Sequence, residues 1–288
     1  MVNDMALLAA GSMDHTLQLF ALNGSVLSLY AICNDGHSAA VSSVDLCSNR
    51  QMASGDWDGS LCIWDVTSSD ESALNQQPSK KTKTDGANVV SDRATTTLTP
   101  KAQIRAHSSN MSGVSWGNFE KNSSSLITGS WDHSIKVWDV ERQDCLLTLN
   151  GSRVVSCLDT SYHSAGIVAT GHPDCTIRLW DARVDSQVEK INDSTLKPSH
   201  REWIADVQWN AQNPYSIAST SHDGTVKVWD IRSPLPLHTV RIGGKGMALC
   251  YGSFENDTYL FAGGTDCIVK QFQCPSFSGK QHNDFNLR

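Results

Sequence analysis

The sequence has little that would mark a membrane, secreted or nucleic-acid-binding protein. No apolar run approaches the roughly 18 residues of a membrane span. The start, MVNDMALLAAG, carries no basic segment ahead of its short apolar run, so we expect no secretory signal. Charged residues make up 18% of the chain and the net charge is −7, whereas sequence-independent nucleic-acid binding needs a basic surface. We therefore expect no membrane association and no direct sequence-specific nucleic-acid binding.

Enzyme and metal-site motifs are also missing from the sequence. It contains no G-x-S-x-G, H-E-x-x-H or P-loop motif, and GGKG at residues 243–246 is interpreted as a turn. The nine cysteines are scattered, odd in number and without a C-x-x-C pair, which indicates free thiols in a reducing compartment. We predict no catalytic residue, no metal site and no cofactor.

What the sequence does contain is a repeat, and each of its six units includes an aspartate. The units read AGSMDHTLQLF, SGDWDGSLCIWD, TGSWDHSIKVWD, TGHPDCTIRLWD, STSHDGTVKVWD and AGGTDCIVKQF. Their aspartates are Asp14, Asp58, Asp132, Asp174, Asp223 and Asp266. These lie 42 to 49 residues apart, except for one separation of 74 between the second and third. A repeat of this length is typical of a propeller or solenoid.

Short strands flank each aspartate. Apolar residues such as Ile135 and Val137 alternate after it, and segments such as SLIT and GIVAT precede it. Four short antiparallel strands in about 43 residues form one blade of a β-propeller. We predict an all-β fold with about six recognisable blades over residues 1–275 and a tail over residues 276–288. The long separation predicts a disordered loop between two strands, residues 67–102, that is rich in Ser and Thr and includes PSKKTKTDG.

The units resemble WD-repeat propellers, in which a histidine bonds the turn aspartate, a Ser or Thr, and a Trp. Such a set satisfies the single N–H of a buried indole and the charge of the aspartate. The resemblance implies three complete sets: His37, Ser54, Asp58 and Trp64; His107, Thr128, Asp132 and Trp138; and His200, Ser219, Asp223 and Trp229. In the fourth unit Asn150–Gly151 replaces the Gly-His, and Phe20 and Phe272 replace the Trp of the first and last units.

A catalytic interpretation of Ser, His and Asp occurring together is disfavoured by the repetition. A catalytic triad occurs once per site and is defined by its geometry, whereas these sets recur at similar spacing beside a Trp. We therefore interpret them as structural.

Several features resemble one WD-repeat family, the ribosome-biogenesis proteins that join Pescadillo and the block-of-proliferation protein in a complex. They are the SMDHT opening, the paired GDWDG and GSWDHSIKVWDVE units with a Lys-rich loop between them, and IRLWDAR and VKVWDIRSP in order. The family has seven blades and a ubiquitin-like domain ahead of them. The first unit here lacks its first strand, so we expect an N-terminally truncated seven-bladed ring.

The resemblance implies a non-enzymatic scaffold for large (60S) ribosomal subunit assembly and rRNA maturation, located in the nucleolus and nucleoplasm. Block-of-proliferation protein and Pescadillo would be its partners within pre-60S particles. An alternative stays open. Substrate receptors of cullin-type ubiquitin ligases often end a repeat with Trp-Asp-x-Arg, which occurs here at residues 180–183 and 229–232.

A binding face is predicted where the histidine loops and the aspartate turns meet at one end of the blades. Residues one step before each aspartate should surround that end, together with Trp203 beside the His200 loop. The predicted partner-binding residues are Met13, Trp57, Trp131, Trp203 and His222. Exposed Trp is a leading contributor to protein interfaces. The alternative is that each indole lies flat across the neighbouring blade.

Overall fold

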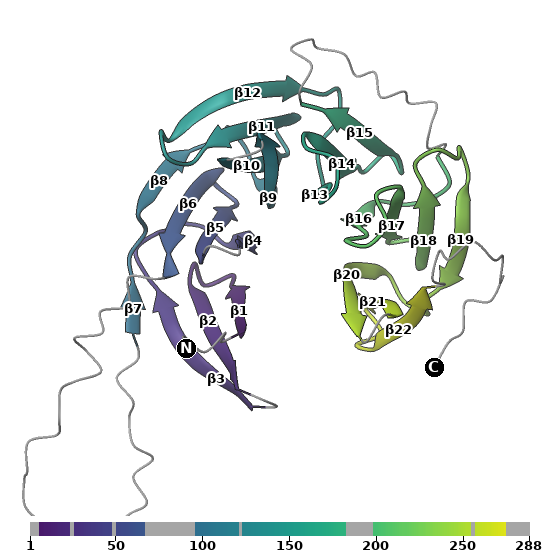
Figure 1. Cartoon of the computed structure of the whole chain (residues 1–288), viewed down its shortest axis with the longest axis horizontal. Coiled ribbons are helices and arrows are strands. Elements are labelled where there is room, and N and C mark those ends of the chain that lie inside the picture. Colours follow the sequence, from purple (N-terminus) through teal and green to yellow (C-terminus); the bar gives the residue numbers. More distant parts are fainter. Residues whose placement is uncertain are drawn as a thin grey trace, which may run out of the picture.

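The computed structural model describes residues 6–23, 26–47, 50–66, 96–120, 123–182, 198–254 and 257–274. These residues form 22 strands in six sheets, which lie side by side along an arc (Figure 1). The sheet that begins with β1 and the sheet of β20–β22 lie at the two ends of this arc. The predictions of an all-β fold and of six blades are confirmed. The described residues contain no helix that is long and apolar enough to cross a membrane.

Each blade is numbered here in chain order. Blade 1 contains β1 (Ala6–Gly11), β2 (Leu17–Asn23), β3 (Val26–Cys33) and β7 (Thr96–Leu98); blade 2 contains β4 (Val41–Leu46), β5 (Gln51–Asp56), β6 (Ser60–Asp65) and β8 (Ala102–Arg105); blade 3 contains β9 (Met111–Glu120), β10 (Ser123–Ser130), β11 (Ser134–Asp139) and β12 (Asp144–Asn150). Blade 4 contains β13 (Cys157–Thr160), β14 (Ile167–Gly171) and β15 (Ile177–Asp181); blade 5 contains β16 (Ile204–Trp209), β17 (Ser216–Ser221), β18 (Thr225–Asp230) and β19 (Pro236–Arg241); blade 6 contains β20 (Gly246–Phe254), β21 (Asp257–Gly264) and β22 (Val269–Cys274).

The end of the predicted loop insertion is structured, which corrects the boundary at residue 102. Residues 96–98 form β7, which pairs in parallel with β3, and β8 begins at Ala102. Leu98 is buried in the core that also contains Trp64. Residues 96–105 therefore join the outer edges of blades 1 and 2. Residues 67–95 and the predicted tail, 276–288, lie outside the described residues.

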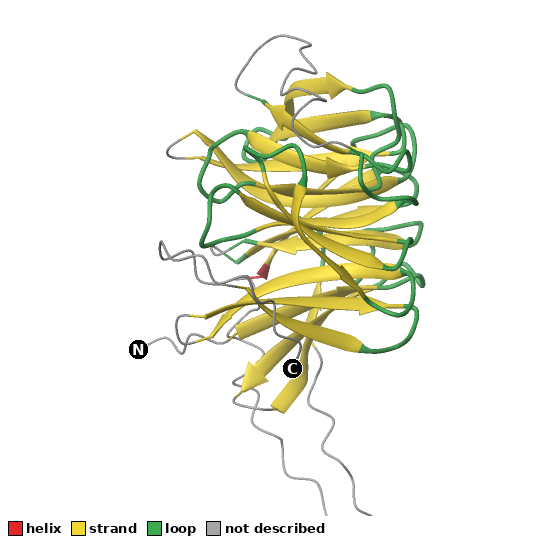
Figure 2. Ribbon diagram, turned by 90° about the vertical axis from the view of Figure 1, so that its right-hand side faces the viewer, coloured by secondary structure: helices red, strands yellow, loops and turns green. Residues whose placement is uncertain are grey.

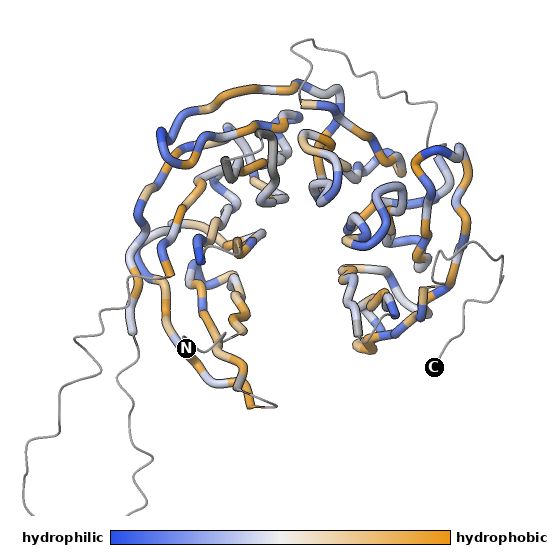
Figure 3. Tube along the Cα trace, viewed as in Figure 1, coloured by the Kyte–Doolittle hydropathy of each residue, from blue (hydrophilic) through white to orange (hydrophobic). Residues whose placement is uncertain are grey.

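The hydrophobic cores lie between neighbouring blades. Leu17 and Leu19 of blade 1 pack with Met52 and Trp64 of blade 2, and comparable clusters join each later pair of blades. Hydrophobic stretches recur along the strands of every blade (Figure 3), and the connecting turns gather at the two opposite ends of the strands (Figure 2). In blades 2 to 5, which have a neighbouring blade on each side, the strands thus supply apolar side chains to both faces of the sheet.

Serine side chains join the innermost strands of consecutive blades. β4, β9, β13, β16 and β20 each lie at one edge of their sheet, so one side of their backbone lacks a strand partner. The Ser42 hydroxyl donates to the Met111 carbonyl, Ser112 donates to the Val155 carbonyl at 2.6 Å, and Ser156 donates to the Ile204 carbonyl at 2.6 Å. Blades 2, 3 and 4 thus each donate a hydrogen bond to the next blade along the chain.

Three carboxylates satisfy backbone N–H groups in the same direction. Asp45 accepts the N–H of Trp116 at 2.8 Å, Asp159 accepts that of Trp209 at 2.7 Å, and Asp206 accepts that of Leu249 at 2.7 Å. The other oxygen of each carboxylate accepts the N–H of the residue that follows it in its own strand. These interactions satisfy edge groups that would otherwise be buried without partners. We call the serine and aspartate contacts together the inter-blade latch.

Because burial raises the pKa values of the latch aspartates, we expect the stability of the protein to depend on pH. Burial raises the pKa of Asp206 to about 7, although two backbone N–H donors oppose this shift. The folded state therefore holds a proton that the unfolded chain releases, and stability falls as the pH rises from about 4 to about 7. Asp206→Asn removes the contribution of this group, while that of Asp159, whose pKa burial also raises to about 7, is present in both proteins. We expect the wild type to gain about 2 kcal/mol of unfolding free energy relative to this variant when the pH falls from about 8 to about 5.

Urea denaturation at several pH values measures this difference. Asp144→Asn, an exposed change on β12, serves as the control and should follow the wild type across the range. A constant difference between the wild type and Asp206→Asn would contradict a proton held at this site.

Candidate functional site

In blades 3 and 5 the structure brings together the four residues of each predicted set. Nε2 of His107 lies 2.8 Å from Oγ1 of Thr128, and its Nδ1 lies 3.0 Å from Oδ2 of Asp132. The Trp138 indole N–H donates to the same threonine oxygen at 2.9 Å. In blade 5 the corresponding distances are 2.8 Å from His200 to Ser219, 3.1 Å from His200 to Asp223 and 2.8 Å from Trp229 to Ser219.

The protonation of these histidines follows from their burial. Burial lowers the pKa of His107 below its usual value, although Asp132 favours the charged ring. A neutral ring donates from Nδ1 to the aspartate and accepts at Nε2 from the threonine hydroxyl, whose oxygen accepts the indole N–H. Thr128 is fully buried and uses its hydroxyl in this relay, so it cannot reach a substrate. Each set satisfies a Trp that packs between blades.

Blade 2 differs from the prediction at one residue. Nδ1 of His37 lies 2.9 Å from Oδ2 of Asp56 and does not contact Asp58. The other contacts are as predicted: Nε2 of His37 lies 2.6 Å from the Ser54 hydroxyl, which accepts the Trp64 indole N–H at 2.8 Å. The side chains of His37 and Asp56 are both fully buried. Asp58 is exposed and accepts a hydrogen bond from the Ser38 hydroxyl at 3.3 Å. The prediction of Asp58 in this set was wrong.

The reason for this difference can be found in the sequence. Blade 2 has Asp56 where blades 3 and 5 have Ser130 and Ser221, so GDWDG offers two carboxylates in one turn. Asp56 ends β5 and reaches inward, and its second oxygen also accepts the N–H groups of Asp58 and Ser60. The pair of aspartates in GDWDG was the available signal.

Blade 4 uses a histidine that the sequence analysis missed. His172 lies in the turn after β14, and its Nε2 is 2.8 Å from Oγ1 of Thr170, which also accepts the Trp180 indole N–H at 2.8 Å. Asp174 pairs instead with Arg178 at 2.8 Å. The histidine of the HPDC turn was the available signal. It lies two residues after Thr170 and replaces the histidine that the preceding loop lacks.

The predicted binding residues lie at one end of the innermost strands. The N–H groups of Trp57, Trp131 and His222 donate to the carbonyls of Ala40, Asn110 and Trp203, at 2.9 to 3.0 Å. Those carbonyls belong to residues that directly precede β4, β9 and β16, so these turns lie at the start of the innermost strands. We call Met13, Trp57, Trp131, Trp203 and His222 the aromatic rim.

Four of the five rim side chains are exposed, His222 is half-buried, and some of them contact one another. Trp57, Trp131 and Trp203 are 48%, 41% and 45% exposed, and Met13 is 72% exposed. Trp203 stacks on His222 with ring centroids 6.4 Å apart, and Trp131 meets Trp203 edge to face at 6.3 Å. Partial exposure together with these contacts gives a preformed aromatic surface across blades 3 and 5, with Trp57 on blade 2.

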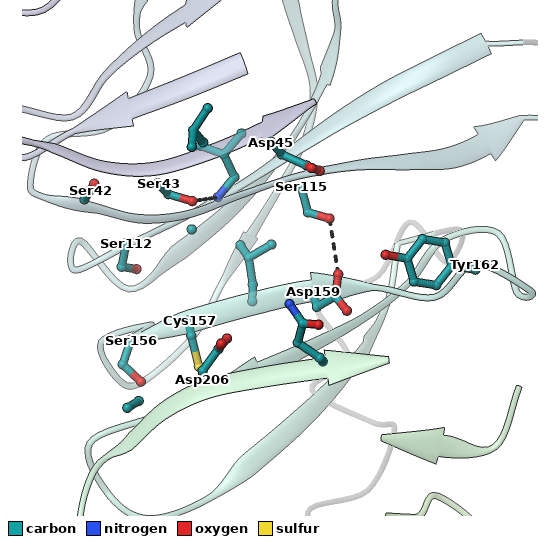
Figure 4. Close-up of a pocket in the computed structure, with 16 residues that line it drawn as sticks. Ser42, Ser43, Asp45, Ser112, Ser115, Ser156, Cys157, Asp159, Tyr162 and Asp206 are labelled. Atoms are coloured by element: carbon teal, nitrogen blue, oxygen red, sulfur yellow. Dashed lines mark hydrogen bonds between the residues drawn. The ribbon is translucent and has the colours of Figure 1, made fainter. Parts of the chain in front are cut away.

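A polar cavity of about 330 Å³ lies between the innermost strands, below the rim. Figure 4 shows Ser42, Ser112 and Ser156 toward one end of it and Tyr162 toward the other, with Asp45, Asp159 and Asp206 between them. Its aspartates are engaged in the inter-blade latch. Within the described ranges, no three His, Cys, Asp or Glu side chains converge as metal ligands.

The two aspartates of blade 2 can be separated by stability. Asp56→Ala should lower the unfolding free energy by about 3 kcal/mol, because it leaves His37 and two N–H groups without an acceptor. Asp58→Ala should leave the denaturation midpoint almost unchanged, since surface substitutions have little effect. Urea denaturation measures both, with Asp132→Ala as a second destabilising case. Equal losses for Asp56→Ala and Asp58→Ala would contradict the assignment of Asp56 to the buried relay.

Comparison with known proteins agrees with this architecture. The family of the WD domain, G-beta repeat, matches residues 28–65, 98–139, 143–181 and 193–230, which together make up more than half of the chain. These segments include the blades that contain a complete Trp relay.

Several similar proteins are named ribosome biogenesis protein WDR12 homolog. The one from Chlamydomonas reinhardtii is 31% identical over 284 residues, covering 93% of this chain and 61% of the relative. The one from Nematostella vectensis is 32% identical over 266 residues, with 89% and 60% covered, and the one from Aedes aegypti is 30% identical over 279 residues, with 95% and 60% covered. The chain thus spans about 60% of the length of these relatives. From the repeat match and the six sheets, we conclude that the chain belongs to the WD-repeat family.

Proposed function

We propose that this chain is a non-enzymatic protein-interaction scaffold in large (60S) ribosomal subunit assembly and rRNA maturation. The observation that carries this proposal is the similarity, over about nine tenths of the chain, to proteins named for ribosome biogenesis. Its partners would be the block-of-proliferation protein and Pescadillo, and its location the nucleolus and nucleoplasm. The buried relays agree with a scaffold, because their hydroxyls satisfy indole donors.

The aromatic rim is the surface that we propose for the partner. Trp131, Trp203 and His222 form a connected aromatic patch at the end of the innermost strands, and Trp57 extends it to blade 2. Partly exposed Trp side chains on a rigid framework lose little conformational freedom on binding, which favours them as anchors for a protein segment. The partner we favour for this surface is the block-of-proliferation protein.

The alternative, a substrate receptor of a cullin-type ubiquitin ligase, receives less support. The guanidinium of Arg232 binds Asp230 through two hydrogen bonds, at 2.9 and 2.6 Å, and lies 4.1 Å from the centre of the Tyr215 ring. An adaptor would have to compete with these contacts. Arg183 lies outside the described residues.

Co-sedimentation tests the role in ribosome assembly. We expect the tagged chain to sediment on a sucrose gradient with pre-60S particles and to capture the block-of-proliferation protein. Capture of a ligase adaptor without sedimentation at that position would contradict the proposal and favour the alternative.

The rim itself is tested by Trp57→Ala combined with Trp131→Ala. We expect loss of partner capture with a small change in melting temperature, because both indoles are nearly half exposed. Leu146→Ala combined with Leu237→Ala is the matched control, since both leucines are exposed on the outer strands β12 and β19. Unchanged capture, or a fall in melting temperature large enough to explain the loss, would assign the two indoles a structural role.

A further inference from the structure

More than half of the net negative charge of the chain lies in its first two blades. Residues 1–66 contain seven aspartates and one basic residue, Arg50, a formal charge of −6 out of a total of −7. Blade 2 also receives Lys101 and Arg105 with its last strand. Arg105 lies opposite Ser60 in the sheet and makes no ion pair with an aspartate of the described residues. With these two cations included, the first two blades carry a formal charge of −4 out of −7, and Asp14, Asp35 and Asp58 are exposed there.

The turn aspartates of these two blades differ from those of the other four. Asp132, Asp174, Asp223 and Asp266 each have a histidine, arginine or lysine within 3.1 Å. Asp14 bonds to Thr16 and Ser12 in its own turn, and Asp58 has the Ser38 hydroxyl because Asp56 occupies His37. In the part of the chain that the structure describes, no cation pairs with Asp14 or Asp58.

Three neighbouring loops bring these carboxylates to one surface. The N–H of Val41 donates to the Ser12 carbonyl at 3.0 Å, and the N–H of Trp57 donates to the Ala40 carbonyl at 3.0 Å. The loop between β3 and β4 therefore lies between the turns of blades 1 and 2. It contributes Asp35, which is exposed and has a φ of 62°. We call Met13, Asp14, Asp35, Trp57 and Asp58 the acidic rim.

We propose that the acidic rim docks a basic, extended segment of a protein partner. Lysine or arginine side chains of that segment bind Asp35 and Asp58, and an arginine or an apolar anchor packs on the exposed indole of Trp57. Arginine stacks on aromatic faces and pairs with carboxylates, so it suits both parts of the surface. The local negative potential also steers a basic segment to this side.

This inference rests on the proposed scaffold function and names the chemistry of its partner. Nucleic acid does not fit the surface, because phosphates are repelled by it. The chain has one basic segment of its own, PSKKTKTDG at residues 78–86, which lies outside the described residues. Occupation by this segment is a separate outcome of the test.

The experiment uses the purified full chain and a labelled peptide. The probe is a fluorescein-labelled peptide of arginine, serine and leucine, and its counterpart has glutamate in place of each arginine. Fluorescence anisotropy measures the affinity of both peptides at about 0.05 M and about 0.3 M salt, between which the screening of exposed charges changes strongly.

The key variant is Asp35→Asn combined with Asp58→Asn, because asparagine tolerates the positive φ at residue 35. Its matched control is Glu141→Gln combined with Asp144→Asn, which removes the same charge from exposed positions on blade 3. Melting temperature is measured for each variant, so a folding defect is distinguished from a loss of binding.

We expect the wild type to prefer the arginine peptide and to bind it more weakly at the higher salt concentration. The rim variant should bind about fivefold more weakly, because two exposed ion pairs are lost, and the blade 3 control should bind like the wild type. Equal losses in the two variants, or equal affinity for the two peptides, would overturn the proposal. So would tighter peptide binding by Lys80→Ala, Lys81→Ala, Lys83→Ala, because it would assign the surface to the chain's own segment.

The two proposals fail separately. Peptide binding by a chain that does not sediment with pre-60S particles supports the acidic rim and contradicts the ribosomal role. Sedimentation with pre-60S particles by a chain that does not prefer the arginine peptide supports the ribosomal role and overturns the acidic rim.

Discussion

The open edge of the innermost strand is the constraint on which this structure depends. β4, β9, β13, β16 and β20 pair with a neighbour on one side, and the backbone groups on the other side face the axis of the arc without a strand partner. A buried N–H or carbonyl without a partner is destabilising by roughly 1–3 kcal/mol. Serines and aspartates of the preceding blade supply those partners. The latch therefore sets how consecutive blades sit and makes the space between them polar.

A second constraint is the single donor of each buried indole. Four Trp side chains pack between blades: Trp64, Trp138, Trp180 and Trp229. The indole N–H of each donates to a Ser or Thr on the second strand from the axis in its blade. The hydroxyl in turn donates to a histidine ring nitrogen. In blades 2, 3 and 5 the other ring nitrogen of that histidine donates to a carboxylate. This chain has three solutions to one problem, because a histidine can come from the preceding loop or from the turn itself, and the carboxylate from either position of the turn.

The variation in the buried relays has a consequence at the surface. Because Asp56 satisfies His37, Asp58 is left exposed beside Trp57 on the part of the molecule that carries most of its negative charge. In blades 3 and 5 the equivalent aspartate is held by histidine and by a backbone N–H, from Ser108 or Arg201. A shift of the buried carboxylate by two residues within one turn thus alters the chemistry of the rim. Blades that are similar in architecture can present different surfaces to partners in this way.

The sequence by itself determined the fold class, the number of blades and most of each relay. Alternating apolar residues define strands locally, and a unit repeated six times shows that the same local solution is used six times. The placement of Trp57, Trp131 and Trp203 together also followed from the sequence, because a histidine and an aspartate that bond must lie at the same end of a blade.

Only the tertiary structure decided which aspartate of GDWDG bonds His37, that His172 replaces the missing loop histidine, and that residues 96–98 pair with β3. It also decided that Asp45, Asp159 and Asp206 act across blades, although Asp206 lies two positions earlier in its strand than the other two do in theirs. Each of these depends on the distance between groups that are far apart in the chain. Local pattern constrains which side chains face inward, but a hydrogen bond forms with whichever partner the packing of neighbouring blades brings within about 3 Å.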